Sequence, residues 1–219
     1  MGGSVVTPPT SAHHSLLKSA LDAQFRNEYF HADAVKLLSN SQSYVARSRI
    51  LNRNALALAT YLNNYRRRQS PSSASSSIVA AVLYPPFTPT AANYAAMMRQ
   101  PPTTATADGG EPFTPGHGCL LAVEFSSLRL ARAFYDNLSV YHGPHLGAHH
   151  TLAFPFNDAI WGTDPEGAAY LRTYGAKAEQ VRVSVGLEDE QELIDTFAAA
   201  LEVAEKVREE EESEERAKS

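Results

Sequence analysis

Residues 181–189 read VRVSVGLED, and this stretch decides how the rest of the chain is interpreted. Its valines occupy alternate positions with Arg182 and Ser184 between them, which is the period of a half-buried β-strand. Asp189 then precedes a run of apolar residues at helical spacing, and aspartate is a preferred helix N-cap. The stretch therefore predicts a short strand that leads directly into a C-terminal helix.

Arg182 is the unusual residue of this strand. An unpaired guanidinium is expensive to bury, so an arginine among apolar neighbours needs a partner. Its planar fork offers a carboxylate two parallel charge-assisted hydrogen bonds. The residues alone leave two partners open: an internal acid such as Glu188, which the spacing by itself favours, or the carboxylate of a ligand.

Hydrophobic patterning on either side of this strand predicts a mixed α+β fold. Residues 101–118, rich in proline, threonine and glycine, are expected to form a long loop. Strands are expected over residues 78–84, 119–125, 140–146, 151–154 and 181–186. Helices are expected within 15–65, with the longest helix of the chain over 40–68, and over 93–99, 127–138 with Ser126 or Ser127 as its cap, and onward from Asp189.

The same patterning divides the chain into four segments. Residues 1–68 are helical and end in three arginines, 66–68, which suit the C-terminus of a helix better than a separate phosphate-binding or localisation patch. Residues 69–77 form a serine-rich linker, and 78–205 form the α+β domain. Residues 206–219 are an acidic tail, expected to be a solvated helix that frays rather than a partner-binding segment.

Composition excludes several classes of protein. The 219 residues are 43 % hydrophobic and 20 % charged, with a net charge of -5, which argues against a nucleic-acid binder. No apolar run approaches the roughly 20 residues of a membrane span, and the first residues lack the pattern of a signal peptide. Cys119 is the only cysteine, so no internal disulfide forms, and a cytoplasmic, reducing location is expected. In its apolar strand Cys119 is interpreted as a small core residue rather than a nucleophile.

Four segments together carry a resemblance to a known family. Residues 181–189 with the helix after them resemble the C-terminal end of the Cys/Met-metabolism family of pyridoxal-phosphate enzymes, and the fungal cystathionine γ-synthase-like branch is the most similar. Residues 40–44, with Arg47 and 54–55, resemble the long helix that links the two domains of that family. Residues 118–125 resemble a strand of its small domain, and 143–147 resemble a serine-leucine-glycine turn beside the substrate pocket. Order and spacing agree from Met1 to about Val203.

The resemblance implies a fold, a reaction and a set of site residues. The expected fold is the helical end of a large domain plus a two-layer small C-terminal domain of the aspartate-aminotransferase-like type. The expected reaction of the complete enzyme is transsulfuration, the γ-replacement of an activated homoserine ester by cysteine to give cystathionine, with cystathionine γ-lyase and homoserine sulfhydrylase as alternatives. Arg182 would hold the α-carboxylate of the small amino-acid substrate, and the backbone of His145, Leu146 and Gly147 would form the wall beside it. Family members are homo-oligomers, so the full enzyme is expected to be one.

The chain departs from the family pattern in two places. His145 replaces the serine of the turn, which removes a pocket hydroxyl. The lysine that carries pyridoxal phosphate lies, in the family, upstream of the segment that matches residues 2–4 here, and none of the lysines at 18, 36, 177, 206 and 218 has its setting. We therefore expect a C-terminal fragment, inactive on its own, without a catalytic or cofactor-attachment residue. The alternative of a different class is a non-catalytic chain that acts only in subunit or partner binding.

Two further groups of residues suggest sites but have simpler interpretations. The histidines 142, 145, 149 and 150 are dense enough for a metal site, yet the alternation of an extended stretch does not place three of them on one face. Phe154, Phe156 and Trp161 flank Pro155 in a predicted loop, where packing is the default role and substrate contact the alternative. No metal is therefore expected.

Overall fold

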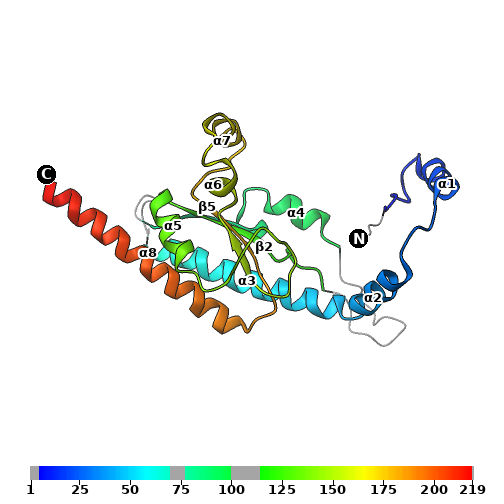
Figure 1. Ribbon diagram of the computed structural model, residues 1–219, viewed down its shortest axis with the longest axis horizontal. Coiled ribbons are helices and arrows are strands. Elements are labelled where there is room, and N and C mark those ends of the chain that lie inside the picture. Colours follow the sequence, from blue (N-terminus) through cyan, green and yellow to red (C-terminus); the bar gives the residue numbers. More distant parts are fainter. Residues whose placement is uncertain (1–4, 70–76, 100–113, 219) are drawn as a thin grey trace. The chain divides into compact units, whose positions relative to one another are not determined.

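The computed structural model describes residues 5–69, 77–99 and 114–218 (Figure 1). Its contacts divide the chain into two units, Met1–Val45 and Ala46–Ser219, which we describe one at a time. The first unit contains α1 (His14–Gln24) and α2 (His31–Ser41), and neither helix has a buried residue. Large apolar side chains of this unit are exposed to solvent, among them Leu16, Phe25, Phe30 and Leu38.

The second unit is built around a five-stranded sheet with the order β1-β2-β5-β4-β3. β5 is the central strand and pairs antiparallel with both β2 and β4, whereas β3 and β4 are parallel. The strands are β1 (Val79–Leu83), β2 (Leu120–Phe125), β3 (Tyr141–His142), β4 (Leu152–Phe154) and β5 (Gln180–Ser184). The helices are α3 (Tyr44–Gln69), α4 (Ala91–Met97), α5 (Leu128–Asp136), α6 (Phe156–Trp161), α7 (Pro165–Arg172) and α8 (Glu190–Lys218), with a 3₁₀ turn at Pro85–Phe87.

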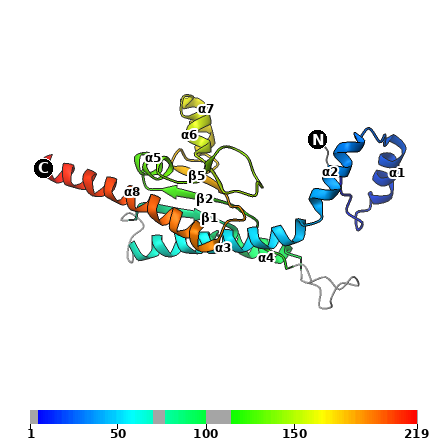
Figure 2. The ribbon, with the colours of Figure 1, turned by 60° about the horizontal axis from the view of Figure 1, so that its bottom comes forward.

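One face of this sheet is closed by helices. Figure 2 shows α3 and α8 running along the same side of the strands. Val181 and Val183 of β5 lie on this face and are fully buried, in one cluster with Leu58 of α3, Phe134 of α5 and Phe197 of α8. Because residues of a strand alternate between faces, this packing fixes which residues point the other way.

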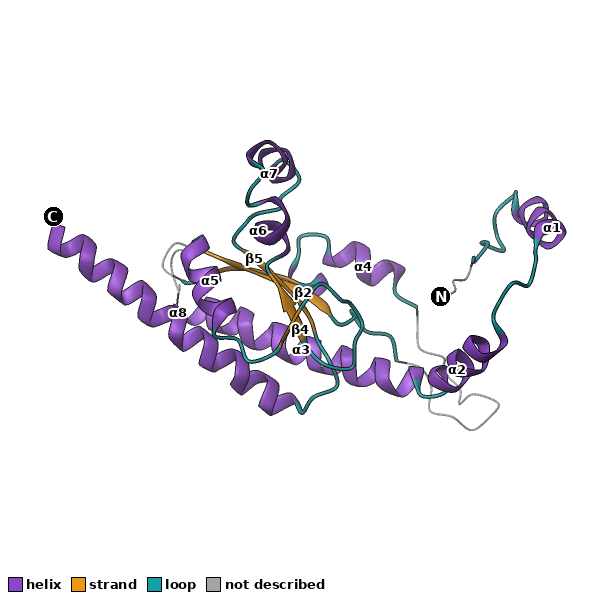
Figure 3. Ribbon diagram, viewed as in Figure 1, coloured by secondary structure: helices purple, strands orange, loops and turns teal. Residues whose placement is uncertain are grey.

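The opposite face of the sheet is the one that carries Arg182. Its partners in register are Ala122 of β2 and Phe154 of β4, so all three side chains project from the same face. Ala122 and Phe154 are only partly covered, and Leu120 remains 42 % exposed. Figure 3 shows α6 and α7 rising from the end of the sheet away from α3 and α8.

Most of the elements expected from the sequence are confirmed. The strands at 78–84, 119–125, 151–154 and 181–186, the helices at 93–99 and 127–138, and the helix after Asp189 are all present within a few residues. Ser127 is the cap of α5, where its hydroxyl accepts a hydrogen bond from the Leu130 N–H at 3.2 Å. Asp189 caps α8 by accepting from the N–H groups of Gln191 and Glu192. Residues 70–76 of the expected linker and 101–113 of the expected loop lie outside the described residues.

Three expectations about elements were wrong. The longest helix is α8, with 29 residues, rather than α3, with 26, because α8 continues through the acidic segment supported by pairs such as Arg208–Glu212. The strand expected over 140–146 is only two residues long, since Pro144 cannot donate to a ladder. The aromatic segment after Pro155 forms α6 instead of a loop, and Asp164 caps a second helix, α7, through the Gly167 N–H.

Within the described ranges, none of the helices has the length and apolar character that crossing a membrane requires.

Candidate functional site

Arg182 occupies the middle of the central strand, with its side chain half-buried. Its Nη2 donates a hydrogen bond of 2.8 Å to the backbone carbonyl of Pro144. Two residues further along β5, on the same face, the buried Ser184 hydroxyl accepts a hydrogen bond of 3.1 Å from the Gly147 N–H. The segment 143–147 is therefore hydrogen-bonded to β5 at two residues, Pro144 and Gly147.

The turn residues expected beside Arg182 are thus next to it in the structure. Gly147 has φ +73, in the left-handed region where glycine avoids the strain of a Cβ. His145 and Leu146 lie between these two hydrogen-bonded residues, and both are exposed, Leu146 by 56 %. The arrangement presents two side chains and a short stretch of backbone to solvent beside the guanidinium.

The guanidinium of Arg182 lies over an aromatic ring. The Phe156 ring centroid lies 4.8 Å from the Arg182 Cζ, a cation–π distance. Phe154, which neighbours Arg182 across the β4–β5 ladder, packs edge-to-face against Phe156 with 6.2 Å between ring centroids. Both phenylalanines therefore belong to the surroundings of Arg182.

The internal salt bridge from Arg182 to Glu188 is not formed. Glu188 instead accepts hydrogen bonds from the Thr151 N–H and, at 2.9 Å, from the Thr151 hydroxyl. A second acid, Glu124, projects from the Arg182 face of β2 but is paired with Lys177 and accepts from Gln180 Nε2 at 3.1 Å. In the part of the chain that the structure describes, no acid pairs with Arg182.

The remaining donors of Arg182 are accessible. Its Nε and Nη1 have no hydrogen-bond partner within the described ranges, yet neither is a buried atom. A guanidinium has two edges with paired parallel donors, and the bond to Pro144 uses one N–H of Nη2. One two-donor edge is therefore left for a planar anion such as a carboxylate.

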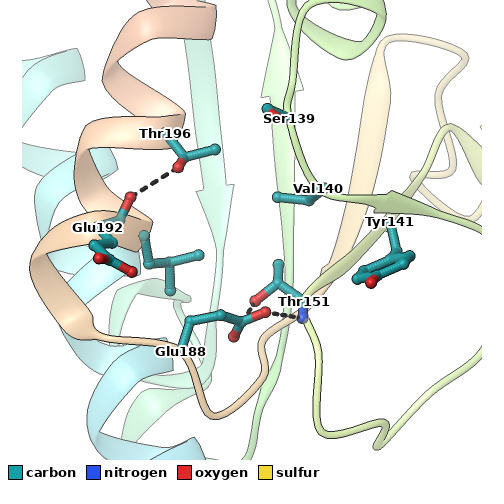
Figure 4. Close-up of a pocket in the computed structure, with 8 residues that line it drawn as sticks. Ser139, Val140, Tyr141, Thr151, Glu188, Glu192 and Thr196 are labelled. Carbon is teal, nitrogen blue, oxygen red and sulfur yellow. Dashed lines mark hydrogen bonds between the residues drawn. The ribbon is translucent and has the colours of Figure 1, made fainter.

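Glu188 belongs to a different region, on the α8 side of the sheet. It lines an open cavity of about 410 Å³ together with Ser139, Val140, Tyr141, Thr151, Glu192, Leu193 and Thr196. Figure 4 shows its carboxylate directed at Thr151. Nearby, the buried Asn54 of α3 donates to the carbonyls of Gly186 and Glu188, at 3.2 and 2.8 Å. Glu188 and Asn54 thus fix the connection between β5 and α8, and the cavity does not include Arg182.

The other candidate residues have structural surroundings. The His142 ring stacks on the Tyr135 ring, with 4.3 Å between their centroids. The ring centroids of His149 and His150 are 3.7 Å apart. Among residues 5–69, 77–99 and 114–218, no three histidine, cysteine or acidic side chains cluster as metal ligands would. Cys119 is partly buried and packs against the core.

Four of the lysines named above have side chains that the structure describes. A Schiff base needs an amine that is held in a pocket beside the substrate. Lys36 and Lys206 are exposed on helices, Lys18 pairs with Asp22 at 3.2 Å, and Lys177 is exposed and paired with Glu124. Among the described residues of the second unit, neither Lys177 nor Lys206 makes a hydrogen bond or ion pair with Arg182 or with the segment 143–147.

The role of Ser184 and of the Pro144 carbonyl was not anticipated from the sequence. The strand period does place Ser184 on the face of Arg182, so this residue carried a signal. The sequence carries no signal that the Pro144 carbonyl, 38 residues away, accepts a hydrogen bond from Arg182. Phe156 was expected to pack, and the partner of its ring, a guanidinium, depends on the pairing of β4 with β5.

The chain is similar in sequence to several fungal proteins, although no family model matches it. It is 31 % identical to the cystathionine gamma-synthase-like enzyme iboG2 of Amanita muscaria, over 95 % of this chain and 32 % of that protein. It is also 31 % identical to the cystathionine gamma-synthase of Neurospora crassa, over 94 % of this chain and 29 % of that protein. The chain thus spans about a third of the length of these relatives.

The relatives include another activity as well. The alanine racemase ungC of Aspergillus violaceofuscus is 28 % identical over 94 % of this chain and 33 % of that protein. Sequence similarity of this degree therefore extends across proteins named for different reactions.

A solved structure agrees in fold. The cystathionine gamma synthase of Xanthomonas oryzae, in complex with cystathionine, superposes with a TM-score of 0.54 at 22 % identity, covering 74 % of this chain and 36 % of that one. At this identity the likeness concerns the fold. The chain is thus similar in sequence to about a third of the length of cystathionine γ-synthase-like proteins, and its fold agrees with that of a cystathionine gamma synthase.

Proposed function

We propose that Arg182 binds the α-carboxylate of an amino-acid substrate in an enzyme of the cystathionine γ-synthase type. The observation that carries this proposal is a half-buried arginine in the central strand whose charge no described acid neutralises. Charged groups at such positions are normally paired, so an unpaired guanidinium with a free two-donor edge indicates an external anion. Glu124 and Glu188, the acids of the adjoining elements, are engaged by other groups.

The names of the relatives support an amino-acid substrate in general. Cystathionine and alanine, which appear in those names, are both α-amino acids, and each carries an α-carboxylate. A residue that binds the α-carboxylate can serve enzymes whose reactions take place at different atoms of the substrate. Recognition of the carboxylate is accordingly the part of the proposal that does not depend on the reaction.

Within this class, the reaction we propose is the γ-replacement of an activated homoserine ester by cysteine to give cystathionine. Cystathionine γ-lyase and homoserine sulfhydrylase chemistry are the alternatives. Pyridoxal phosphate stabilises negative charge at the substrate Cα in such reactions and, on this proposal, is held by residues other than those described here. The part of Arg182 is to fix the orientation of the substrate, and the segment 143–147 forms a wall beside it.

The proposal is tested by the binding of L-homoserine to the purified chain. The guanidinium N–H resonances of ¹⁵N-arginine-labelled protein report directly on the Arg182 Nε, which is assigned with the Arg182→Lys variant. We expect a saturable shift of the Arg182 signal in the millimolar range with L-homoserine. The same titration with 3-aminopropan-1-ol, which lacks only the carboxylate, should leave the signal unchanged.

Two variants complete this test. Because Arg182→Gln lacks the Arg182 signal, the variants are compared by the backbone amide resonances of the segment 143–147. Arg182→Gln should abolish binding, whereas Arg129→Gln, which removes an exposed arginine paired with Glu211 at 3.2 Å, should bind as the parent chain does. Equal shifts with the two ligands, or unchanged affinity in Arg182→Gln, would contradict the role assigned to Arg182.

A second candidate function is subunit or partner binding without catalysis. It is favoured by the first unit, where Leu16 is 71 % exposed, Phe25 75 % and Phe30 69 %. Large apolar groups gathered on a surface mark an interaction site. Sedimentation velocity at increasing concentration separates the two functions: self-association that Phe25→Lys removes, without any binding of L-homoserine, would favour this candidate.

A further inference from the structure

Two described contacts hold different parts of the Arg182 guanidinium. A hydrogen bond of 2.8 Å joins Nη2 to the Pro144 carbonyl. The central carbon, Cζ, lies over the Phe156 ring, 4.8 Å from its centroid. The first contact restrains one nitrogen, and the second keeps the centre of the guanidinium over the ring.

We propose that Phe156 is a positioning residue for Arg182 and that its ring holds the guanidinium in the place from which it binds the substrate carboxylate. This inference rests on the proposed function of Arg182. A bidentate carboxylate bond needs the two planar groups to be aligned, and a free arginine side chain samples many rotamers. A guanidinium that is already aligned loses less freedom when it binds.

A phenylalanine is chemically suited to this task. It attracts the cation through its electron-rich face but has no hydrogen-bond acceptor, so it leaves every N–H of the guanidinium available. An acid in the same place would hold Arg182 equally well but would occupy the donors that the substrate needs. The accessible Nε and Nη1 of Arg182 are what this difference predicts.

The ring of Phe156 is itself fixed in place. Phe156 is the first residue of α6, directly after Pro155, whose ring restricts the backbone at the entrance of the helix. Phe154 packs against it edge-to-face, with an interplanar angle of 72°. Since Phe154 is the register partner of Arg182, the β4–β5 ladder sets the height of the ring relative to the guanidinium.

The test varies the electron density of the ring and measures L-homoserine affinity by the Arg182 resonance. Replacement of Phe156 by mono-, di- and trifluorophenylalanine keeps the shape and progressively weakens the attraction for a cation. We expect the dissociation constant to rise stepwise, by about fivefold across the series, and the Arg182 Nε–H signal of the free protein to broaden or shift in the same order. A ring that served only as packing would show no such trend.

Substitutions of Phe156 by standard amino acids give an independent test. Phe156→Leu should weaken L-homoserine binding by at least about fivefold, and Phe156→Tyr should restore affinity to within about twofold, because the tyrosine ring keeps the π face. Tyr174→Leu is the matched control, since it removes an aromatic ring that is 73 % exposed on the α7 side. Thermal unfolding shows whether each variant is folded. If Phe156→Leu does not fold, the fluorinated series still tests the positioning role.

The outcomes separate this inference from the proposed function. If Arg182→Gln abolishes binding but the fluorinated series and Phe156→Leu bind as the parent chain does, the positioning role is wrong and carboxylate recognition stands. If the parent chain does not bind L-homoserine, or Arg182→Gln binds it unchanged, the proposed function fails and the positioning role fails with it.

Discussion

At the scale of residues, the site depends on which charges are paired. Glu188 and Glu124 are each satisfied by neighbouring groups, and this leaves Arg182 with a carbonyl and an aromatic ring as its only described partners. The sequence indicated that Arg182 needs a partner but suggested Glu188, six residues away. The actual partner of Glu188 is Thr151, 37 residues earlier, and only the pairing of β4 with β5 brings the two together.

Glu188 gives the first prediction. Glu188→Gln replaces one carboxylate oxygen by an NH2 group, so one of the two Thr151 donors, its N–H or its hydroxyl, loses its acceptor. We expect the free energy of unfolding to fall by about 1–3 kcal/mol, the usual effect of losing a hydrogen bond to a charged group. Urea unfolding measures the change. Glu202→Gln, at an exposed position of α8, is the control and should change stability by less than about 0.5 kcal/mol.

At the scale of elements, local patterns predicted what local interactions build. The strand over 181–186 and the Ser127 and Asp189 caps follow from side-chain period and cap chemistry, which act within a few residues. α6 is only six residues long, too short for a helical period to show, and it is placed by packing against β5. α7 did carry a signal, an aspartate followed by proline at the first helical position.

The cap of α5 gives the second prediction. Ser127→Ala removes the acceptor for the Leu130 N–H at the start of a helix that packs against both α8 and the sheet. We expect a loss of about 1 kcal/mol in the free energy of unfolding. Ser213→Ala, within α8, is the comparison, because its hydroxyl only returns to the Glu210 carbonyl and alanine favours a helix. A Ser127→Ala chain as stable as the parent would show that the cap is unimportant.

At the scale of the whole molecule, one face of the sheet forms the core, and the other carries the candidate site. The face of Val181 and Val183 closes on three helices, and the face of Arg182 stays half-covered. The resemblance of 143–147 and 181–189 to family motifs predicted that turn and strand lie together, and the structure places them in contact. What those residues bind remains a prediction, since the chain spans a third of its relatives.

Global stability at alkaline pH gives the third prediction. Burial raises the pKa of Tyr84 above its ordinary value of about 10, and its hydroxyl donates to the Gly118 carbonyl at 2.9 Å. Burial, followed by the neighbouring Glu205, likewise raises the pKa of Tyr65. The unfolded chain therefore releases these protons first, so the stabilisation is complete below about pH 10 and is lost as the pH rises further.

This prediction is measured by urea unfolding between about pH 8 and pH 11. Tyr84→Phe should be less stable than the parent chain at pH 8, because it lacks the bond to Gly118. Its stability should nevertheless decline less steeply above pH 10, because one buried phenol no longer resists ionisation. Parallel declines for the two proteins would show that Tyr84 does not contribute to alkaline unfolding.

The most direct test of carboxylate recognition is a crystal structure of the chain soaked in L-homoserine. We expect both carboxylate oxygens within roughly 2.7–3.2 Å of two Arg182 nitrogens, with the bonds to Pro144 and the ring of Phe156 retained. Ordered ligand that leaves Arg182 untouched, or an Arg182 side chain turned to pair with an acid of the chain itself, would contradict the account.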